Sequence, residues 1–314
     1  MVSLAGARFR KVPDQRSQPS SLLNRLARPI SVPVVAVAAA PPGAPGRRLA
    51  ERVLQVDKSD PIARLVLGVR AIKQKQYPVS RRELTQSIRG PITDLAATLL
   101  SAWTMANPSE AKQATDSMDK LTGADWYAIF KDLHAALILD VAGQKKEAAK
   151  RFERAYKLDA TALRVVQSYG SFLSRQGNTT EALKVFATFD EALPRHPLIV
   201  EATNELKAGK KLPLVVDTPQ AGAAEVFFGL GAALGRSGGE DLGLIYLQLS
   251  LYLAPSHPLA LLALGDFYER PLGRTVTASS KSRIRAARPS CVIGFWIIST
   301  PGSSRPWWTM AFRE

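Results

Sequence analysis

The chain has 314 residues, of which 46% are hydrophobic and 22% charged, ordinary values for a folded globular protein. A single cysteine, Cys291, excludes an internal disulfide and a cysteine-based metal site. The formal net charge of +15 would, on composition alone, favour binding to nucleic acid.

The N-terminal segment 1–45 is predicted to be a disordered leader rich in proline and arginine, because its scattered prolines interrupt any helix. Its one apolar run, 30–40, contains Pro33 and follows a basic, polar stretch. A secretory signal has the same order of parts, and Ala-Val-Ala at 36–38 resembles a cleavage site. A periplasmic or exported protein is therefore the alternative. The long leader and the broken apolar run favour a cytoplasmic one.

Residues 46–57 have the spacing of one amphipathic helix, with Ala50 and Val53 on its apolar face. The helix corresponds to the second half of the repeating unit that follows, and no first half precedes it. We expect it to cap the array or to mark a truncated unit.

A repeated pattern organises 46–196, beginning with the half-unit at 46–57 and continuing in full units from 61. A turn glycine, a small residue and a bulky residue each recur 34 positions later: Gly143 and Gly177, Ala148 and Ala182, Phe152 and Phe186. Within the second helix of each unit, apolar residues lie four and three positions apart and so share one helix face: Ala148, Phe152 and Ala155, then Ala182, Phe186 and Phe189. The glycine separates this helix from another apolar helix before it. Each unit is therefore predicted to be helix, tight turn, helix.

Four units, starting at 61, 95, 129 and 163, share two packing positions. Position 8 is small and position 24 is bulky, as expected where the two helices of a unit touch: Gly68, Ala102, Ala136 and Gly170, with Leu84, Met118, Phe152 and Phe186. The unit at 95–128 departs from the pattern, since it has Ser101 where leucine is usual and no turn glycine.

The segment 197–223 is predicted to be an insertion with one helix, 198–208. Insertions in repeat arrays map to one face, often the binding face, although a passive linker is the simpler interpretation. Two further units follow in 224–270, starting at 224 and 258, and the second stops after its first helix.

The remaining segment, 271–314, is a basic and irregular tail in which arginines alternate with aromatic residues. The repeat pattern stops in the middle of a unit where this tail begins, which suggests that a frameshift or truncation produced both chain ends. The charge is also concentrated there, at +7 in 1–48 and +6 in 271–314, leaving +2 for 49–270. Binding of nucleic acid or an anionic surface would therefore depend on the ends, and the nearly neutral repeats argue against it.

The units resemble the tetratricopeptide repeat (TPR) of bacterial helical-repeat scaffolds. The resemblance rests on these residues: Leu67-Gly68, Tyr77 and Leu84, then Leu230-Gly231, Gly238, Leu247 and Pro255. It spans 46–270 and implies an all-α fold, a right-handed superhelical solenoid of helix-turn-helix repeats. It also implies a protein-protein interaction scaffold, although members of the family share architecture rather than chemistry.

By this resemblance, first-helix positions line a concave groove that binds a partner peptide or helix. The expected groove residues are Leu65, Val69, Lys73, Phe130, Leu133, Leu137, Arg164, Gln167, Ser171 and Arg175. The groove changes from apolar to polar and basic along the chain, which suggests a ligand with an apolar segment followed by acidic residues. The Lys and Asn with which some members hold a terminal carboxylate are missing here.

No constellation for catalysis is present in the sequence. No phosphate-binding loop occurs. His196 and His257 fall at turns between units, and His134 lies on a first helix beside Asp132, where it could face the groove. Paired carboxylates lie on predicted solvated helix faces. We therefore predict no catalytic residue, cofactor or metal, and a protein that is not an enzyme. A fragment of a larger enzyme that carries a TPR domain is the alternative.

An aromatic cluster is expected near the second and third units, formed by Trp103, Trp126, Tyr127 and Phe130. Core packing is the simpler interpretation, and an anchor pocket for a partner side chain is the other. The sequence contains no transmembrane segment, and it does not specify the partner or the oligomeric state.

Overall fold

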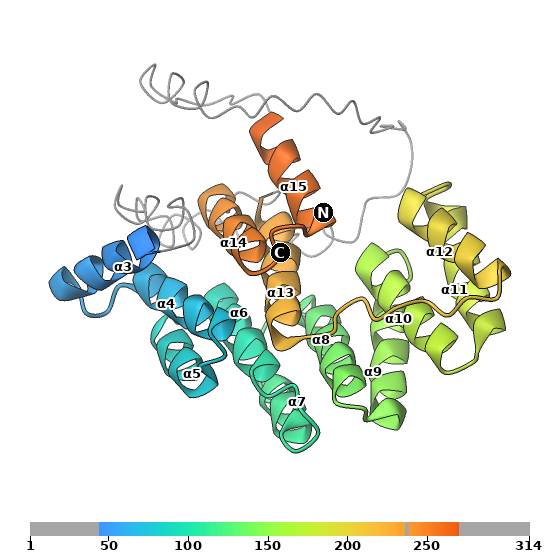
Figure 1. Ribbon diagram of the computed structural model, residues 1–314, viewed down its shortest axis with the longest axis horizontal. Helices are drawn as coiled ribbons and strands as arrows, with labels where there is room; N and C mark the ends of the chain where they lie inside the picture. The colour runs from blue at the N-terminus through green and yellow to red at the C-terminus, as the bar shows by residue number, and fades with distance from the viewer. Residues whose placement is uncertain (1–43, 236–238, 270–314) are drawn as a thin grey trace, which may run out of the picture.

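The computed structural model describes residues 44–235 and 239–269, and all regular secondary structure in these ranges is helical. The helices, labelled as in Figure 1, are α3 (Ala44–Val56), α4 (Pro61–Lys73), α5 (Tyr77–Gln86), α6 (Pro91–Trp103), α7 (Ala111–Asp119), α8 (Tyr127–Val141), α9 (Lys145–Leu158), α10 (Leu163–Arg175), α11 (Thr179–Ala192), α12 (Pro197–Lys207), α13 (Pro219–Leu234), α14 (Glu240–Leu253) and α15 (Pro258–Glu269). The tail 271–314 and nearly all of the leader lie outside the described residues.

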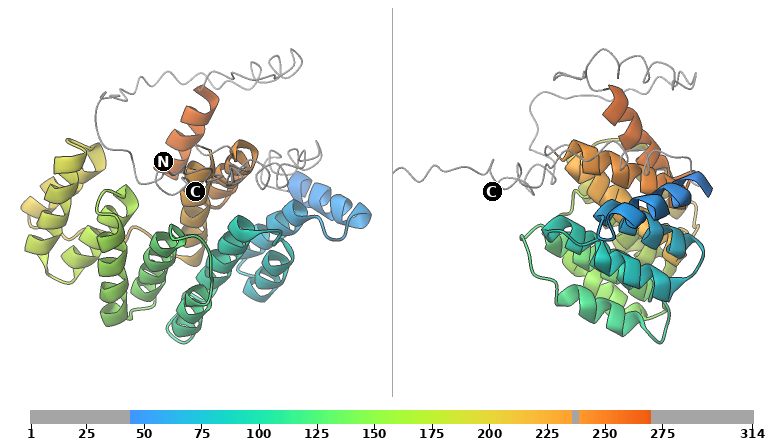
Figure 2. Two further views of the ribbon diagram at one scale, coloured as in Figure 1. Left: turned by 180° about the vertical axis from the view of Figure 1, so that it is seen from behind. Right: turned by 90° about the vertical axis from the view of Figure 1, so that its left-hand side faces the viewer.

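Four helical hairpins, α4–α5, α6–α7, α8–α9 and α10–α11, lie side by side in chain order. Helix α3 packs on the first hairpin, and α12 packs on the last. Together these elements form an arc, which Figure 1 shows from one side and Figure 2 from behind and from the end. The prediction of an all-α helical-repeat solenoid is confirmed.

The small residue at position 8 lets the two helices of a hairpin approach closely. An added Cβ at Gly170 would lie 2.3 Å from the Phe186 ring, and one at Gly68 would lie 3.0 Å from Leu84. Both bulky side chains are almost completely buried. The sequence pattern of small and bulky residues is therefore the contact that closes each hairpin.

The turns inside the hairpins use the left-handed backbone conformation that the glycines allow. Gly143 has φ +76° and Gly177 has φ +86°. In each turn the next residue donates its N–H to a carbonyl five positions back, at 2.8 Å for Gln144 and 2.9 Å for Asn178. The first hairpin has Lys75 at the same position, with φ +58°.

The second hairpin departs from the pattern where the sequence does. Its first helix begins at Pro91, directly after Gly90 and ahead of the expected start at 95. In place of a glycine turn, the side-chain oxygen of Asn107 accepts the backbone N–H groups of Ser109 and Glu110, both at 3.1 Å. An asparagine-capped loop thus joins α6 to α7.

After α12 the chain turns back along the arc instead of continuing it. A non-helical segment, 208–218, leads to α13, which begins at Pro219 with the Thr218 side chain as its cap. Helix α13 packs against α4, α6 and α8, and α14 packs against α13 and α4. The repeat pattern alone would place this fifth hairpin beyond α11, but it lies inside the arc (Figure 1).

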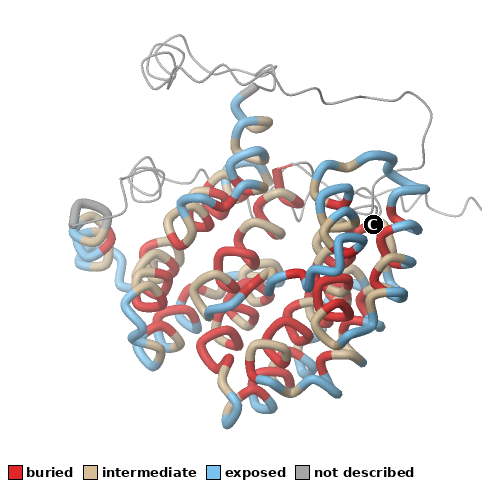
Figure 3. Tube along the Cα trace, turned by 45° about the vertical axis from the view of Figure 1, so that its right-hand side comes forward, coloured by how far each residue is buried: buried red, intermediate tan, exposed pale blue. Residues whose placement is uncertain are grey.

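Two hydrophobic clusters reflect this arrangement. The larger one contains buried residues of the first three hairpins together with residues of α13 and α14. A second cluster joins α10, α11 and α12 through residues such as Phe186, Phe189 and Ile199. Figure 3 shows the buried residues along the packed helices, whereas α15 projects from the body with few of them. Leu261, Leu262 and Tyr268 on α15 are about half exposed.

Candidate protein-interaction groove

The ten expected groove residues lie on α4, α8 and α10, the first helices of three hairpins. In this structure their face is not open. Leu65, Val69, Phe130, Leu137 and Ser171 are buried, and the other five are partly buried. Helices α13 and α14, which form a hairpin, and the segment 208–218 before them cover this concave face. The groove is therefore filled by another segment of the same chain.

Helix α6 forms the centre of the groove through Trp103, one of the four aromatic residues that the sequence predicts either in the core or in an anchor pocket. Trp103 is fully buried, and the backbone of Gly222 in α13 lies directly against its indole ring. Because a side chain at 222 would overlap this ring, only glycine lets α13 approach so closely. Farther along α13, an added Cβ at Gly229 would lie 3.0 Å from the ring of Phe130.

A buried histidine supports the tryptophan from α8. The Trp103 indole N–H donates to Nδ1 of His134 at 3.1 Å. Burial lowers the pKa of His134 to about 4, so the ring is neutral at pH 7 and its Nδ1 can accept. The other aromatic residues of this region stack edge to face, with 4.5 Å between the ring centroids of Trp126 and Tyr127.

A buried ion pair joins the basic part of the groove to α13. Arg164 on α10 contacts both carboxylate oxygens of Glu225, with Nε 3.0 Å from Oε2. Nε2 of His257 lies 2.9 Å from Oε1, an oxygen that Arg164 also contacts. Because Nδ1 of His257 accepts the N–H of Ala260 at 3.1 Å, the ring donates to Glu225 through Nε2.

The carboxylate of Glu225 stays ionised in this network. Burial by itself would raise its pKa, but the charge of Arg164 and the hydrogen bond from His257 lower the pKa to about 2. The network thus ties α10, α13 and the turn before α15 together. Sequence reasoning missed Glu225, although an acidic residue within the apolar run 221–234 was a signal for it.

Polar contacts also fix the two ends of the covering segment. At one end, Nζ of Lys73 donates to the carbonyl of Tyr252 at 2.6 Å and lies 4.1 Å from the centre of its ring. At the other end, the Ser171 hydroxyl donates to the carbonyl of Pro213, and the Leu212 N–H donates to Ser174 at 3.0 Å. The first and fourth hairpins are therefore both bonded to the returning chain.

Arg175 is engaged within the arc rather than with the covering segment. Its guanidinium contacts Asp140 on α8 through two bonds of 3.0 and 2.5 Å. Gln167 accepts from Arg164 at 3.0 Å. Of the basic residues expected in the groove, only Lys73 and Arg164 thus contact the returning chain.

The residues on the concave face therefore contact a second segment of the same chain, through the pairs Lys73–Tyr252, Arg164–Glu225 and Ser171–Pro213. Within the described ranges, no group of three or more His, Cys, Asp or Glu residues is placed to hold a metal ion. A search of the same residues finds no helix that is both long and apolar enough to cross a membrane.

Comparison with known proteins finds no matching family model and no matching curated protein. Among solved structures, the chain is similar to YrrB, described as a TPR protein with an unusual peptide-binding site. The identity is 16% and the TM-score is 0.32, over 71% of this chain and 98% of YrrB. The chain's own 34-residue period and its stacked hairpins are the features that it has in common with TPR folds.

Proposed function

We propose that this protein is an interaction scaffold whose concave groove binds an α-helical or extended segment of a partner protein. We further propose that its own α13–α14 hairpin competes with that partner for the groove. The observation that carries the proposal is the seating of α13 against α4, α6 and α8, with the buried Arg164–Glu225 ion pair at one edge. The groove therefore already holds a polypeptide.

The chemistry of the hairpin indicates what an external ligand would present. Helix α13 presents Gly222 to Trp103 and Gly229 to Phe130, within an apolar run of sequence, and the acidic Glu225 to Arg164. The gradient of the groove residues suggests a partner with the same combination of apolar and acidic groups. A partner with the same features would replace the hairpin contact by contact.

Competition with an internal segment sets the affinity for the partner. If the groove is open in only a small fraction of molecules, the apparent affinity falls by that fraction. Weakening the contacts of the hairpin would therefore raise the affinity for an external ligand without any change in the ligand's own contacts.

The test uses a fluorescent synthetic peptide, residues 212–254 of this chain, and the full-length protein. In the Glu225→Arg variant the substituted residue repels Arg164, so the hairpin leaves the groove more often, whereas the peptide keeps its own Glu225. We expect the peptide to bind this variant at least about tenfold more tightly than the unchanged protein. Glu240→Arg, a charge reversal at an exposed position of α14, is the matched control.

Binding must also depend on the groove. Adding Arg164→Glu to the Glu225→Arg variant would remove the partner of the peptide's carboxylate and is expected to weaken binding again. Equal affinity for the unchanged protein, the Glu225→Arg variant and the Glu240→Arg control would contradict the proposal.

A further inference from the structure

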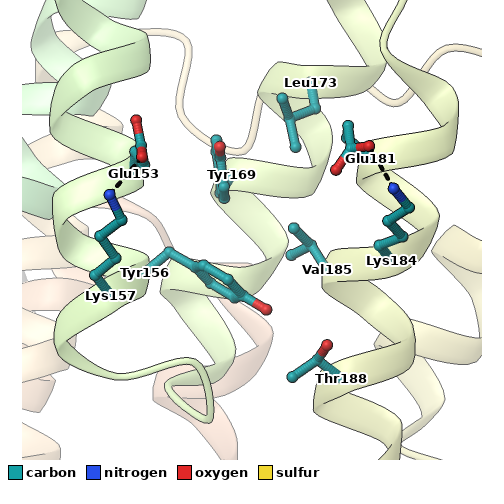
Figure 4. Close-up of a pocket in the computed structure, with 9 residues that line it drawn as sticks. All are labelled: Glu153, Tyr156, Lys157, Tyr169, Leu173, Glu181, Lys184, Val185 and Thr188. Carbon is teal, nitrogen blue, oxygen red and sulfur yellow. Dashed lines mark hydrogen bonds and ion pairs between the residues drawn. The ribbon is translucent and has the colours of Figure 1, made fainter.

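A pocket lies outside the groove, between α9 and α11 and over α10. Its volume is about 320 Å³, and Figure 4 shows the side chains around it. Tyr156 and Tyr169 contribute their rings, and Leu173 and Val185 contribute aliphatic surface. Glu153 and Lys157 stand on one side of the open space, and Glu181 and Lys184 stand on the other. The groove proposed above shares none of these residues.

The repeat pattern explains why the space exists. One unit earlier, position 23 holds Arg151, whose guanidinium lies between two carboxylates, Asp119 on α7 and Asp132 on α8. In the fourth unit, position 23 is Val185, whose short apolar side chain cannot form an ion pair with a carboxylate on α9. The residue equivalent to Asp119 is Glu153. The side chain that joins α9 to α7 thus has no counterpart between α11 and α9.

The carboxylates at the pocket have only weak partners of their own. Glu153 contacts Lys157 and Glu181 contacts Lys184, each within one turn of its own helix. All four side chains are more than half exposed. Such pairs contribute little and are readily exchanged for another cation.

The aromatic wall responds to the same negative charges. The ring centroids of Tyr156 and Tyr169 lie 5.6 Å apart. Burial raises the pKa of the Tyr169 hydroxyl, and the charges of Glu153 and Glu181 raise it further. Both carboxylates therefore act on the space beside this ring, where a cation would also face an aromatic surface.

We propose that this pocket binds an arginine side chain of a partner protein. A guanidinium is planar, weakly hydrated and rich in donors, so it can lie against the tyrosine rings and bond both carboxylates. The aliphatic part of the arginine would lie along Leu173 and Val185. The incoming side chain would occupy the place that Arg151 fills from within the chain one repeat earlier.

The probe is N-acetyl-arginine N-methylamide, titrated into the full-length protein with ¹³C-labelled tyrosine rings and followed by NMR. We expect saturable shifts at Tyr156 and Tyr169, and binding at least about tenfold weaker for the citrulline analogue, which has the same shape and no charge. Saturable shifts of equal strength with citrulline, or no saturable shifts at these two tyrosines, would overturn the proposal.

Two variants test the location of the site independently: one removes a carboxylate and the other fills the pocket. Glu153→Gln is a surface change that should weaken arginine binding several-fold, whereas Glu147→Gln, on the same helix and paired with Lys150, should not alter it. Val185→Arg should fill the pocket from within and abolish the tyrosine shifts. Undiminished binding to both Glu153→Gln and Val185→Arg would show that arginine binds elsewhere. Because these residues lie outside the groove, the outcome is independent of the peptide experiment.

Discussion

Arg164 on α10 and Glu225 on α13 form a buried ion pair between residues 61 positions apart in the chain. Removing one partner of a fully buried pair costs roughly 3–5 kcal/mol, and the lower end applies here because the Arg164 side chain is 21% exposed. We expect Glu225→Ala to lower the free energy of unfolding by about this amount in urea denaturation. A loss within the range of ordinary surface substitutions would show that the pair is not formed in solution.

The same carboxylate predicts a dependence of stability on pH. The pKa of Glu225 falls from 4.5 to about 2 on folding, so its contribution is complete above pH 4.5 and is lost as the pH falls towards 2. The difference in unfolding free energy between the unchanged protein and Glu225→Gln should therefore shrink over this interval. Urea titrations at several pH values measure it. A constant difference from pH 6 to pH 2 would contradict the assignment.

A third prediction concerns two hairpins that place opposite charges at the same pair of positions. Arg64 and Glu83, at positions 4 and 23 of the first unit, lie 2.6 Å apart, and the third unit has Asp132 and Arg151 there, 2.9 Å apart. Because the fold accepts either order, Arg64→Glu with Glu83→Arg should recover most of the stability that each single reversal loses. Each single reversal should cost about 2–4 kcal/mol. If the double variant loses as much stability in thermal unfolding as the two single reversals together, the two charges cannot be exchanged at these positions.

Position 8 allows a comparison of two glycines in the same kind of helix. An added Cβ at Gly170 would meet the Phe186 ring, so Gly170→Ala should destabilise by about 1–3 kcal/mol. At Gly265 no described atom lies within 4 Å of the added Cβ, and Gly265→Ala should be neutral or mildly stabilising through its helix propensity. Thermal unfolding distinguishes the two. Equal effects would contradict the close packing of α10 on α11.

The first hairpin turn offers a stabilising substitution. Lys75 has φ +58° at the position where the third and fourth hairpins have glycine. A lysine is strained in this conformation and a glycine is not, so Lys75→Gly should raise the unfolding free energy by about 0.5–1 kcal/mol. Lys150→Gly, in the middle of α9, should instead lower it by about 1 kcal/mol. A loss of stability in Lys75→Gly would show that the turn relaxes differently.

The hairpins were predictable because their contacts are local. Gly170 and Phe186, or Gly68 and Leu84, lie sixteen positions apart, and the same types recur with a fixed period. A pattern of this kind reports the packing inside a unit and between neighbours. The early start of α6 was visible only as a departure from the pattern, through the missing turn glycine.

The return of the chain into the groove was not predictable in this way. It depends on contacts such as that of Lys73 with Tyr252, 179 positions apart, and on Gly222 fitting against Trp103. No period relates these residues. The predicted groove residues lie on α4, α8 and α10. Their occupant could be identified only from the structure, and Glu225 and Gly222 are its specific features.

The returning hairpin also changes how the protein should unfold. In an open solenoid each repeat contacts only its neighbours, so folding spreads along a row and the ends fray independently. Here α13 packs against three of the earlier first helices, and the large cluster includes residues from both ends of that span. The protein should therefore melt more cooperatively while α13 and α14 occupy the groove than after they have left it, with the arc folded in both states. The distant contacts should slow its folding relative to a simple repeat array, because closing long loops precedes the gain from packing.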